Sequence, residues 1–204
     1  MSDTFQQALA LIKLDQPFEA LPLLNQAIEA QPEWSEAYRQ RAKIMRRLGD
    51  GEGAIADYTR AIRLTPSAEI YLARALVWLS LAQVHGAITD SREAVKLKPA
   101  LAGGHRLLGK ALGMLGDGVG AIAAYKQAAR CYLAAKDKEN AQACLGAIGP
   151  LRALPPLMEE RGSRGAGEQR SGVTPEVFMA RVRASYAAGE YAQAMKALNW
   201  FLDF

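Results

Sequence analysis

Small and apolar residues recur along most of the chain with a period of 33 or 34 residues, which Pro32, Pro66 and Pro99 also follow. Alanine fills two positions of four successive blocks, at Ala20, Ala54, Ala87 and Ala121 and then at Ala27, Ala61, Ala94 and Ala128. Before the two alanines of each block comes a small residue, and a large apolar residue follows it three positions later. These residues are Ala8 with Leu11, Ala42 with Met45, Ala75 with Trp78 and Gly109 with Leu112. Residues at such spacings share one helix face. Each block therefore predicts two antiparallel helices that approach closely at the small residues.

The turn between the two helices carries clear signals in the second and fourth blocks. Gly49-Asp50-Gly51 and Gly116-Asp117-Gly118 can end one helix at glycine and cap the next with aspartate. The first and third blocks depart from this pattern, with Leu14-Asp15-Gln16-Pro17 and Ala82-Gln83-Val84-His85. A proline after the second helix predicts the connection to the next block, and the fourth block lacks it.

A helix-turn-helix unit of this length, with these small, aromatic and proline positions, resembles the tetratricopeptide repeat. The resemblance covers roughly three-quarters of the chain, and in the second block it rests on Ala42, Met45, Gly49, Asp50, Ala54, Tyr58, Ala61 and Pro66. The tryptophan expected early in the first helix is replaced by Thr4, Tyr38, Tyr71 and His105. The resemblance implies an all-α, right-handed superhelical solenoid of antiparallel helix pairs. It also implies a concave surface, lined by the first helices, that binds peptide segments of other proteins.

The periodicity and a change in composition divide the chain into parts. We expect four repeats over about 1–34, 35–67, 68–100 and 101–136, and a capping helix over 137–154 that begins at Asp137 and buries Ala141, Cys144, Leu145 and Ile148. Residues 155–173 are rich in Gly, Ser, Arg and Glu and predict a flexible linker. Residues 174–204 predict a fifth, diverged helical hairpin. Because the chain stops at Phe204, before the next periodic proline, we expect a piece of a longer array.

Composition and charge argue against several classes of partner. The chain has 204 residues, half of them hydrophobic, but no apolar run long enough to span a membrane. Its net charge of +4 is too small to indicate a nucleic-acid partner. The N-terminus lacks the pattern of a secretory signal. We therefore expect a cytoplasmic protein that has neither a nucleic-acid nor a membrane partner.

The sequence lacks the motifs of an enzyme. It has no glycine-rich phosphate loop, no histidine pair at metal-ligand spacing and no nucleophile elbow, so we expect no catalysis, no cofactor and no metal site. Packing or surface roles are the simplest interpretation of His85 and His105. Cys131 and Cys144 are expected to be small buried side chains, with a disulfide as the alternative. Carboxylates are expected mostly on solvent-facing helix surfaces, as at Glu93, Asp57 and Glu36.

The residues expected to bind a partner lie on the first helices of three blocks. They are Arg39, Lys43, Arg46 and Arg47 in the second block, Leu72, Leu76 and Leu79 in the third, and Arg106 and Lys110 in the fourth. The four basic residues of the second block share one side of their helix because they recur at helical spacing. Basic walls around an apolar floor suit a segment that carries Asp or Glu beside a leucine or an aromatic residue. The alternative interpretation is that the basic residues only solubilise the surface.

These observations predict a non-catalytic adaptor or scaffold that binds a peptide segment of a partner protein. The alternative is that the repeats belong to a larger multidomain enzyme or regulator that continues beyond Phe204. A carboxylate clamp of the kind by which the resembled family holds chaperone tails is not expected, because its Lys and Asn positions hold Phe5, Leu9, Gln40, Glu69 and Ala73. Nucleic-acid binding would rest on the four basic residues of the second block alone and would weaken steeply with salt.

Overall fold

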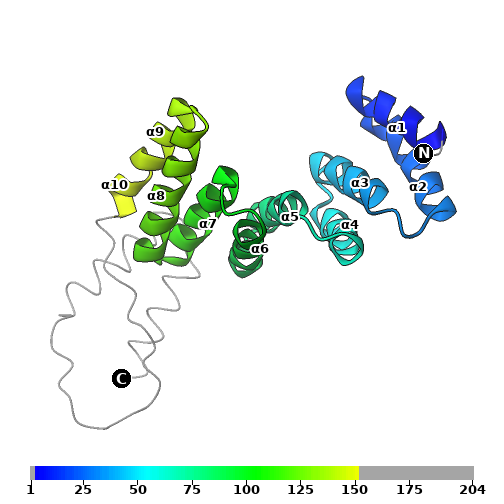
Figure 1. Ribbon diagram of the computed structural model, residues 1–204. Coiled ribbons are helices and arrows are strands. Elements are labelled where there is room, and N and C mark those ends of the chain that lie inside the picture. The colour runs from blue at the N-terminus through cyan, green and yellow to red at the C-terminus, as the bar shows by residue number, and fades with distance from the viewer. Residues whose placement is uncertain (1–2, 152–204) are drawn as a thin grey trace, which may run out of the picture. The chain divides into compact units, whose positions relative to one another are not determined.

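The computed structural model describes residues 3–151, which are helical and contain no strand (Figure 1). The helices are α1 Asp3–Lys13, α2 Pro17–Ala30, α3 Ser35–Arg47, α4 Gly51–Leu64, α5 Ala68–Ser80, α6 Val84–Leu97, α7 Ala102–Leu115, α8 Gly118–Ala134, α9 Lys138–Gly146 and α10 Ile148–Leu151. The expected linker over 155–173 and the hairpin over 174–204 lie outside the described residues.

Consecutive helices form pairs, and the pairs follow one another along the chain. The partners within each pair are α1 with α2, α3 with α4, α5 with α6, and α7 with α8. Each second helix also contacts the first helix of the next pair, and α8 contacts α9 (Figure 1). Each pair therefore buries its apolar face on its neighbours, as expected of a repeat array. The all-α class predicted from the sequence is confirmed.

The close-approach positions are buried as predicted. The side chains of Ala8, Ala42, Ala54 and Ala87 are fully shielded from solvent. Gly109 shows why the position must be small. A Cβ atom there would lie 3.0 Å from the ring of Tyr125 and 3.2 Å from a backbone oxygen, closer than normal packing permits.

Aspartate caps begin two of the second helices, α4 and α8, and also α9. The Asp50 and Asp117 carboxylates each accept a hydrogen bond at 2.8 Å, from the backbone N–H groups of Gly53 and Gly120. Asp137 accepts one from Asn140 N–H at 3.0 Å and so begins α9. These bonds satisfy N–H groups that have no partner within the helix. All three caps were predicted from the sequence.

The turns between paired helices share a left-handed residue, whatever side chain the chain supplies there. Gly49 and Gly116 have φ values of 88° and 87°. In the turns that lack the glycine signal, Asp15 and Ala82 adopt φ values of 60° and 57°. The first and third blocks therefore make the same kind of turn with residues for which this conformation costs about 1–2 kcal/mol.

The end of the described array differs from the single helix expected over 137–154. The helical run is divided into α9 and α10 around Ala147, and both helices pack on α8. Cys144 and Ile148 are buried as predicted, but Leu145 is 49% exposed. Cys131 and Cys144 are free thiols, which contradicts the disulfide alternative. Within residues 3–151, no helix combines the length and apolar character needed to cross a bilayer.

Candidate functional site

Two of the basic residues on α3 are already engaged by acidic neighbours. The Arg39 guanidinium donates two hydrogen bonds of 2.6 Å to the carboxylate of Glu36, one turn earlier on the same helix. Arg47, at the end of α3, donates to Asp15 in the turn between α1 and α2. Their charges are therefore partly neutralised within the protein.

Lys43 and Arg46 form no ion pair within the described residues. The pKa of Lys43 lies below its usual value because burial disfavours the ammonium ion and Arg39 and Arg46 repel it. The fully buried ring of Tyr58, from α4, lies beneath this face, and its hydroxyl has no hydrogen-bond partner of good geometry among residues 3–151, although Arg46 lies beside it. Burial raises the pKa of Tyr58, so the hydroxyl stays protonated. This surface of α3 carries more positive than negative charge, since Glu36 is the acidic residue that acts on Lys43, and its access to water is restricted; both properties favour a bound carboxylate.

The apolar residues of α5 differ in how accessible they are. Leu76 is 42% exposed, whereas Leu72 and Leu79 are half-buried. Leu79 packs against the apolar core that α6 and α7 share with α8, so part of its surface is committed to the fold. Leu76 is therefore the residue of α5 that offers most apolar surface to a partner.

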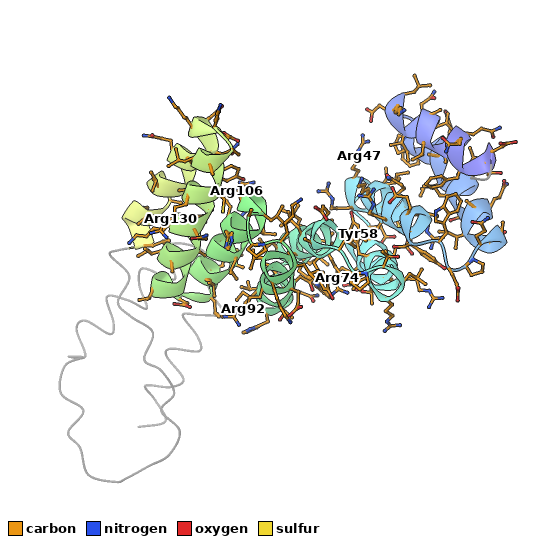
Figure 2. All side chains as sticks on the ribbon, viewed as in Figure 1. Arg47, Tyr58, Arg74, Arg92, Arg106 and Arg130 are labelled. Atoms are coloured by element: carbon orange, nitrogen blue, oxygen red, sulfur yellow. The ribbon has the colours of Figure 1, made fainter. Side chains whose placement is uncertain are left out.

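The basic residues of α7 are solvent-exposed. Arg106 and Lys110 are one helical turn apart and form no ion pair within residues 3–151. Figure 2 shows Arg106 and Arg47 on the same side of the row of helices, with Arg92 of α6 on the opposite side. Arg47 and Arg106 of the first helices therefore lie on a side of the row that is distinct from the side of Arg92 on a second helix.

The three first helices lie next to one another in the order α3, α5, α7. Helix α5 contacts both α3 and α7. Glu69, at the start of α5, is close enough to Arg39 of α3 to affect its pKa. One repeat further on, a Cβ atom built on Gly103 of α7 would contact Leu72 of α5 at 3.4 Å. The structure thus brings the nine expected residues onto three adjacent helices, which together form what we call the first-helix face.

A cavity of about 520 Å³ lies at one edge of this face, where α3 and α5 begin. Trp34, Arg39 and Ile70 contribute to its wall, and acidic residues line it at Glu33, Glu36 and Glu69. The sequence did not predict this cavity, because its wall combines loop residues from two repeats. Because the cavity is lined by acidic residues, the basic surface near Arg39 lies on the side that faces away from the cavity, toward Lys43.

A buried network of ion pairs was also missed by the sequence analysis. The Arg41 guanidinium donates two 2.7 Å hydrogen bonds to Asp57 and a third to Asn25 of the preceding repeat. Asp57 is only 6% exposed, so its expected place on a solvent-facing surface is wrong. The reason is that the guanidinium supplies the charge and the hydrogen bonds that a buried carboxylate needs.

The same network recurs one repeat later. Arg74 donates two 2.7 Å bonds to Asp90 and one to Thr59 of the preceding repeat, and the indole N–H of Trp78 donates to Asp90 at 3.0 Å. Each arginine also lies over a tyrosine ring on its own helix, Tyr38 or Tyr71. The fourth repeat holds an apolar pair, Leu108 and Ala124, at the equivalent positions. The sequence does contain a pattern from which these ion pairs could have been predicted, because an arginine is followed by an aspartate 16 residues later in both repeats.

Comparison with known proteins agrees with this architecture. The family model of the tetratricopeptide repeat matches residues 5–69 and 41–101. The DnaJ protein P58IPK homolog A of Oryza sativa subsp. japonica is 37% identical over 67 residues, which are 33% of this chain but only 14% of that protein. A MamA structure from Desulfovibrio magneticus RS-1 aligns with 19% identity and a TM-score of 0.59, over 74% of this chain and 97% of the other. YrrB, described as a TPR protein with an unusual peptide-binding site, aligns with 17% identity and a TM-score of 0.57, over 73% and 84% of the two chains.

These similarities and the helix pairing define the class as a helical repeat protein with a superhelical solenoid fold. Residues 5–101 of the chain consist of tetratricopeptide repeats, as the family model shows. The family and the fold predicted from the sequence are thereby confirmed.

Proposed function

We propose that this chain is a non-catalytic protein-interaction module that holds a peptide segment of another protein on its first-helix face. The observation that carries the proposal is a row of cations on two helices that form no ion pair within residues 3–151. They are Lys43 and Arg46 on α3 and Arg106 and Lys110 on α7, and they lie around the exposed Leu76 of α5. The reported peptide-binding site of YrrB, which has the same fold, supports a peptide as the ligand.

The chemistry of the face favours a segment that carries both acidic and apolar side chains. A carboxylate placed near Lys43 would relieve the repulsion from Arg39 and Arg46 that lowers the pKa of that lysine. A leucine or an aromatic side chain would cover Leu76 and remove apolar surface from water. Both parts of the face contribute, so charge alone does not define the partner. The same proposal holds if these repeats are the interaction region of a larger enzyme or regulator.

A peptide library displayed on phage tests the proposal on the full chain. We expect selection to enrich peptides that contain both acidic and apolar residues. Binding should weaken when Arg39→Glu is combined with Lys43→Glu, and also with Leu76→Asp, because the first replaces attraction with repulsion and the second places a charge on the apolar surface.

Two control variants separate this face from general surface effects. Arg60→Glu with Arg63→Glu makes the same change in net charge on α4, a second helix, and should leave binding unchanged. Leu133→Asp changes an exposed leucine of α8 in the same way. Each variant must keep the helical circular dichroism and the unfolding midpoint of the parent. Equal losses in the control and first-helix variants, or selection of no peptide, would refute the proposal.

A further inference from the structure

The repeats are of two alternating kinds, and the alternation extends beyond the partner-binding residues. Arg39, Lys43 and Tyr58 of the second repeat recur two repeats later as Arg106, Lys110 and Tyr125, together with the Gly-Asp-Gly turn. Leu9 and Ile12 of the first repeat recur in the same way as Leu76 and Leu79, together with a turn residue other than glycine at positive φ, Asp15 or Ala82. Even repeats are therefore basic where odd repeats are apolar.

This alternation determines the order of chemistry across the first-helix face. Because α5 lies between α3 and α7 and contacts both, successive helices present basic, apolar and basic groups. Packed helices lie about 8–10 Å apart. The basic group at Lys43 and the one at Lys110 are thus separated by two such steps, with Leu76 in the middle.

We infer that the partner segment binds across these three helices in an extended conformation, with acidic, apolar and acidic residues at every third position. This inference rests on the proposed function and specifies its ligand. In the extended polyproline II conformation a chain advances about 3.1 Å per residue with three residues per turn, so three residues cover one helix step and every third side chain points to the same side. The pattern reads the same in both directions, so it holds whichever way the segment runs.

A helical ligand fits this face less well. An amphipathic helix binds a groove through apolar anchors that recur at i, i+3 or i+4, and i+7. At about 1.5 Å per residue these anchors extend over roughly 10 Å, which is the width of one helix step. A stripe of this length that starts at Leu76 ends one helix step away, so its last apolar anchor would lie against the basic groups of α3 or α7. An extended segment instead places one side chain of matching character on each helix.

Three synthetic peptides of identical composition, with blocked ends, test the spacing on the full chain. The first carries glutamate at its first and seventh positions and leucine at its fourth, with serine and glycine elsewhere. The second places the two glutamates side by side and the leucine at one end. The third carries serine and glycine between its glutamate, leucine and glutamate, so that each of these residues is seven positions from the next. The first two carry the same number of serine and glycine residues at their ends, which keeps length and composition equal. Fluorescence anisotropy should show that the first binds roughly ten-fold more tightly than the other two.

A charge exchange tests which helix contacts which residue. Lys110→Glu should weaken binding of the first peptide roughly ten-fold, and replacing one of its glutamates with lysine should restore the affinity for that variant. Lys126→Glu, on an exposed position of α8, makes the same charge change on a second helix and should have no effect. Failure of the lysine peptide to restore binding would overturn the assignment of an acidic residue to α7.

The outcomes separate this inference from the function on which it rests. Equal affinity for the first and second peptides overturns the spacing, and tighter binding of the third overturns the extended conformation. Failure of all three peptides also overturns the inference. In each of these cases the proposed function stands if library-selected peptides still bind and lose affinity in the first-helix variants. If selected peptides fail as well, both proposals fall.

Discussion

The buried ion pair between Arg74 and Asp90 should make a large contribution to stability, and Asp90→Ala tests this. The substitution removes the acceptor of two 2.7 Å bonds from Arg74 and of one 3.0 Å bond from the Trp78 indole. The Asp90 side chain is 3% exposed and that of Arg74 is 16% exposed, so little water can replace the lost carboxylate. Of its hydrogen bonds within residues 3–151, Arg74 would keep the one to Thr59, and it would still lie over the Tyr71 ring.

The expected cost follows from leaving a buried charge without a partner. Breaking such a pair by removing one member typically costs about 3–5 kcal/mol. Because part of the Arg74 side chain reaches solvent, we expect the lower end, about 3 kcal/mol. With a urea dependence of about 1–3 kcal/mol per molar, the unfolding midpoint should fall by about 1–3 M.

A double variant separates the charge effect from packing. Arg74→Leu with Asp90→Ala installs the pair that the fourth repeat already holds at Leu108 and Ala124. It leaves no unpaired charge, so we expect a loss of only about 1–2 kcal/mol, mainly because the Trp78 indole still loses its acceptor. Urea titration followed by far-ultraviolet circular dichroism measures both variants against the parent protein.

Two results would refute this reasoning. A loss below about 1 kcal/mol for Asp90→Ala would mean that water or rearrangement compensates Arg74. A double variant as unstable as Asp90→Ala alone would mean that lost packing, and not the unpaired guanidinium, causes the destabilisation.

Three further predictions concern the turns, the close-approach sites and the thiols. Gly49→Ala should lower stability by about 1 kcal/mol in urea titrations through backbone strain alone, since φ is 88° and a Cβ atom would contact nothing within 4 Å; no loss would show that the turn relaxes. Ala54→Leu should cost about 1–3 kcal/mol by overpacking, whereas Glu52→Leu, at an exposed position of the same helix, should cost less than about 0.5 kcal/mol; equal midpoints would contradict the repeat register. An alkylating reagent should modify Cys131 before Cys144, because Cys144 is buried and burial raises its thiol pKa; peptide mapping by mass spectrometry that shows the reverse order would contradict the packing of α9.

The fold was predictable because the features that determine it are periodic in the sequence. A small residue is required wherever paired helices meet, so Ala54 and Gly109 reveal the close approach without any knowledge of the rest of the structure. The capping role of Asp50 is equally local, because its carboxylate reaches a backbone N–H only three residues away. The positive φ at Ala82 was not predictable from that residue type, because alanine rarely adopts it and the requirement comes from the repeated turn geometry.

The candidate site was predictable only as a set of helix positions. The spacing of Lys43, Leu76 and Lys110 placed them on first helices, but their exposure depends on neighbours from other elements. Arg47 is engaged by Asp15, which lies 32 residues earlier in the preceding repeat, so no local sequence pattern reveals this pairing. Asp57 was assigned to a solvent-facing surface because helical periodicity alone does not show that a guanidinium lies opposite it.

The bonds that join neighbouring repeats through arginine have a direction along the chain. Arg41 reaches back to Asn25 and Arg74 reaches back to Thr59, each in the second helix of the preceding repeat. On a ribosome, which releases the N-terminal part first, each acceptor therefore emerges before the arginine that binds it. The array can assemble vectorially, with every finished helix pair serving as the template on which the next one docks.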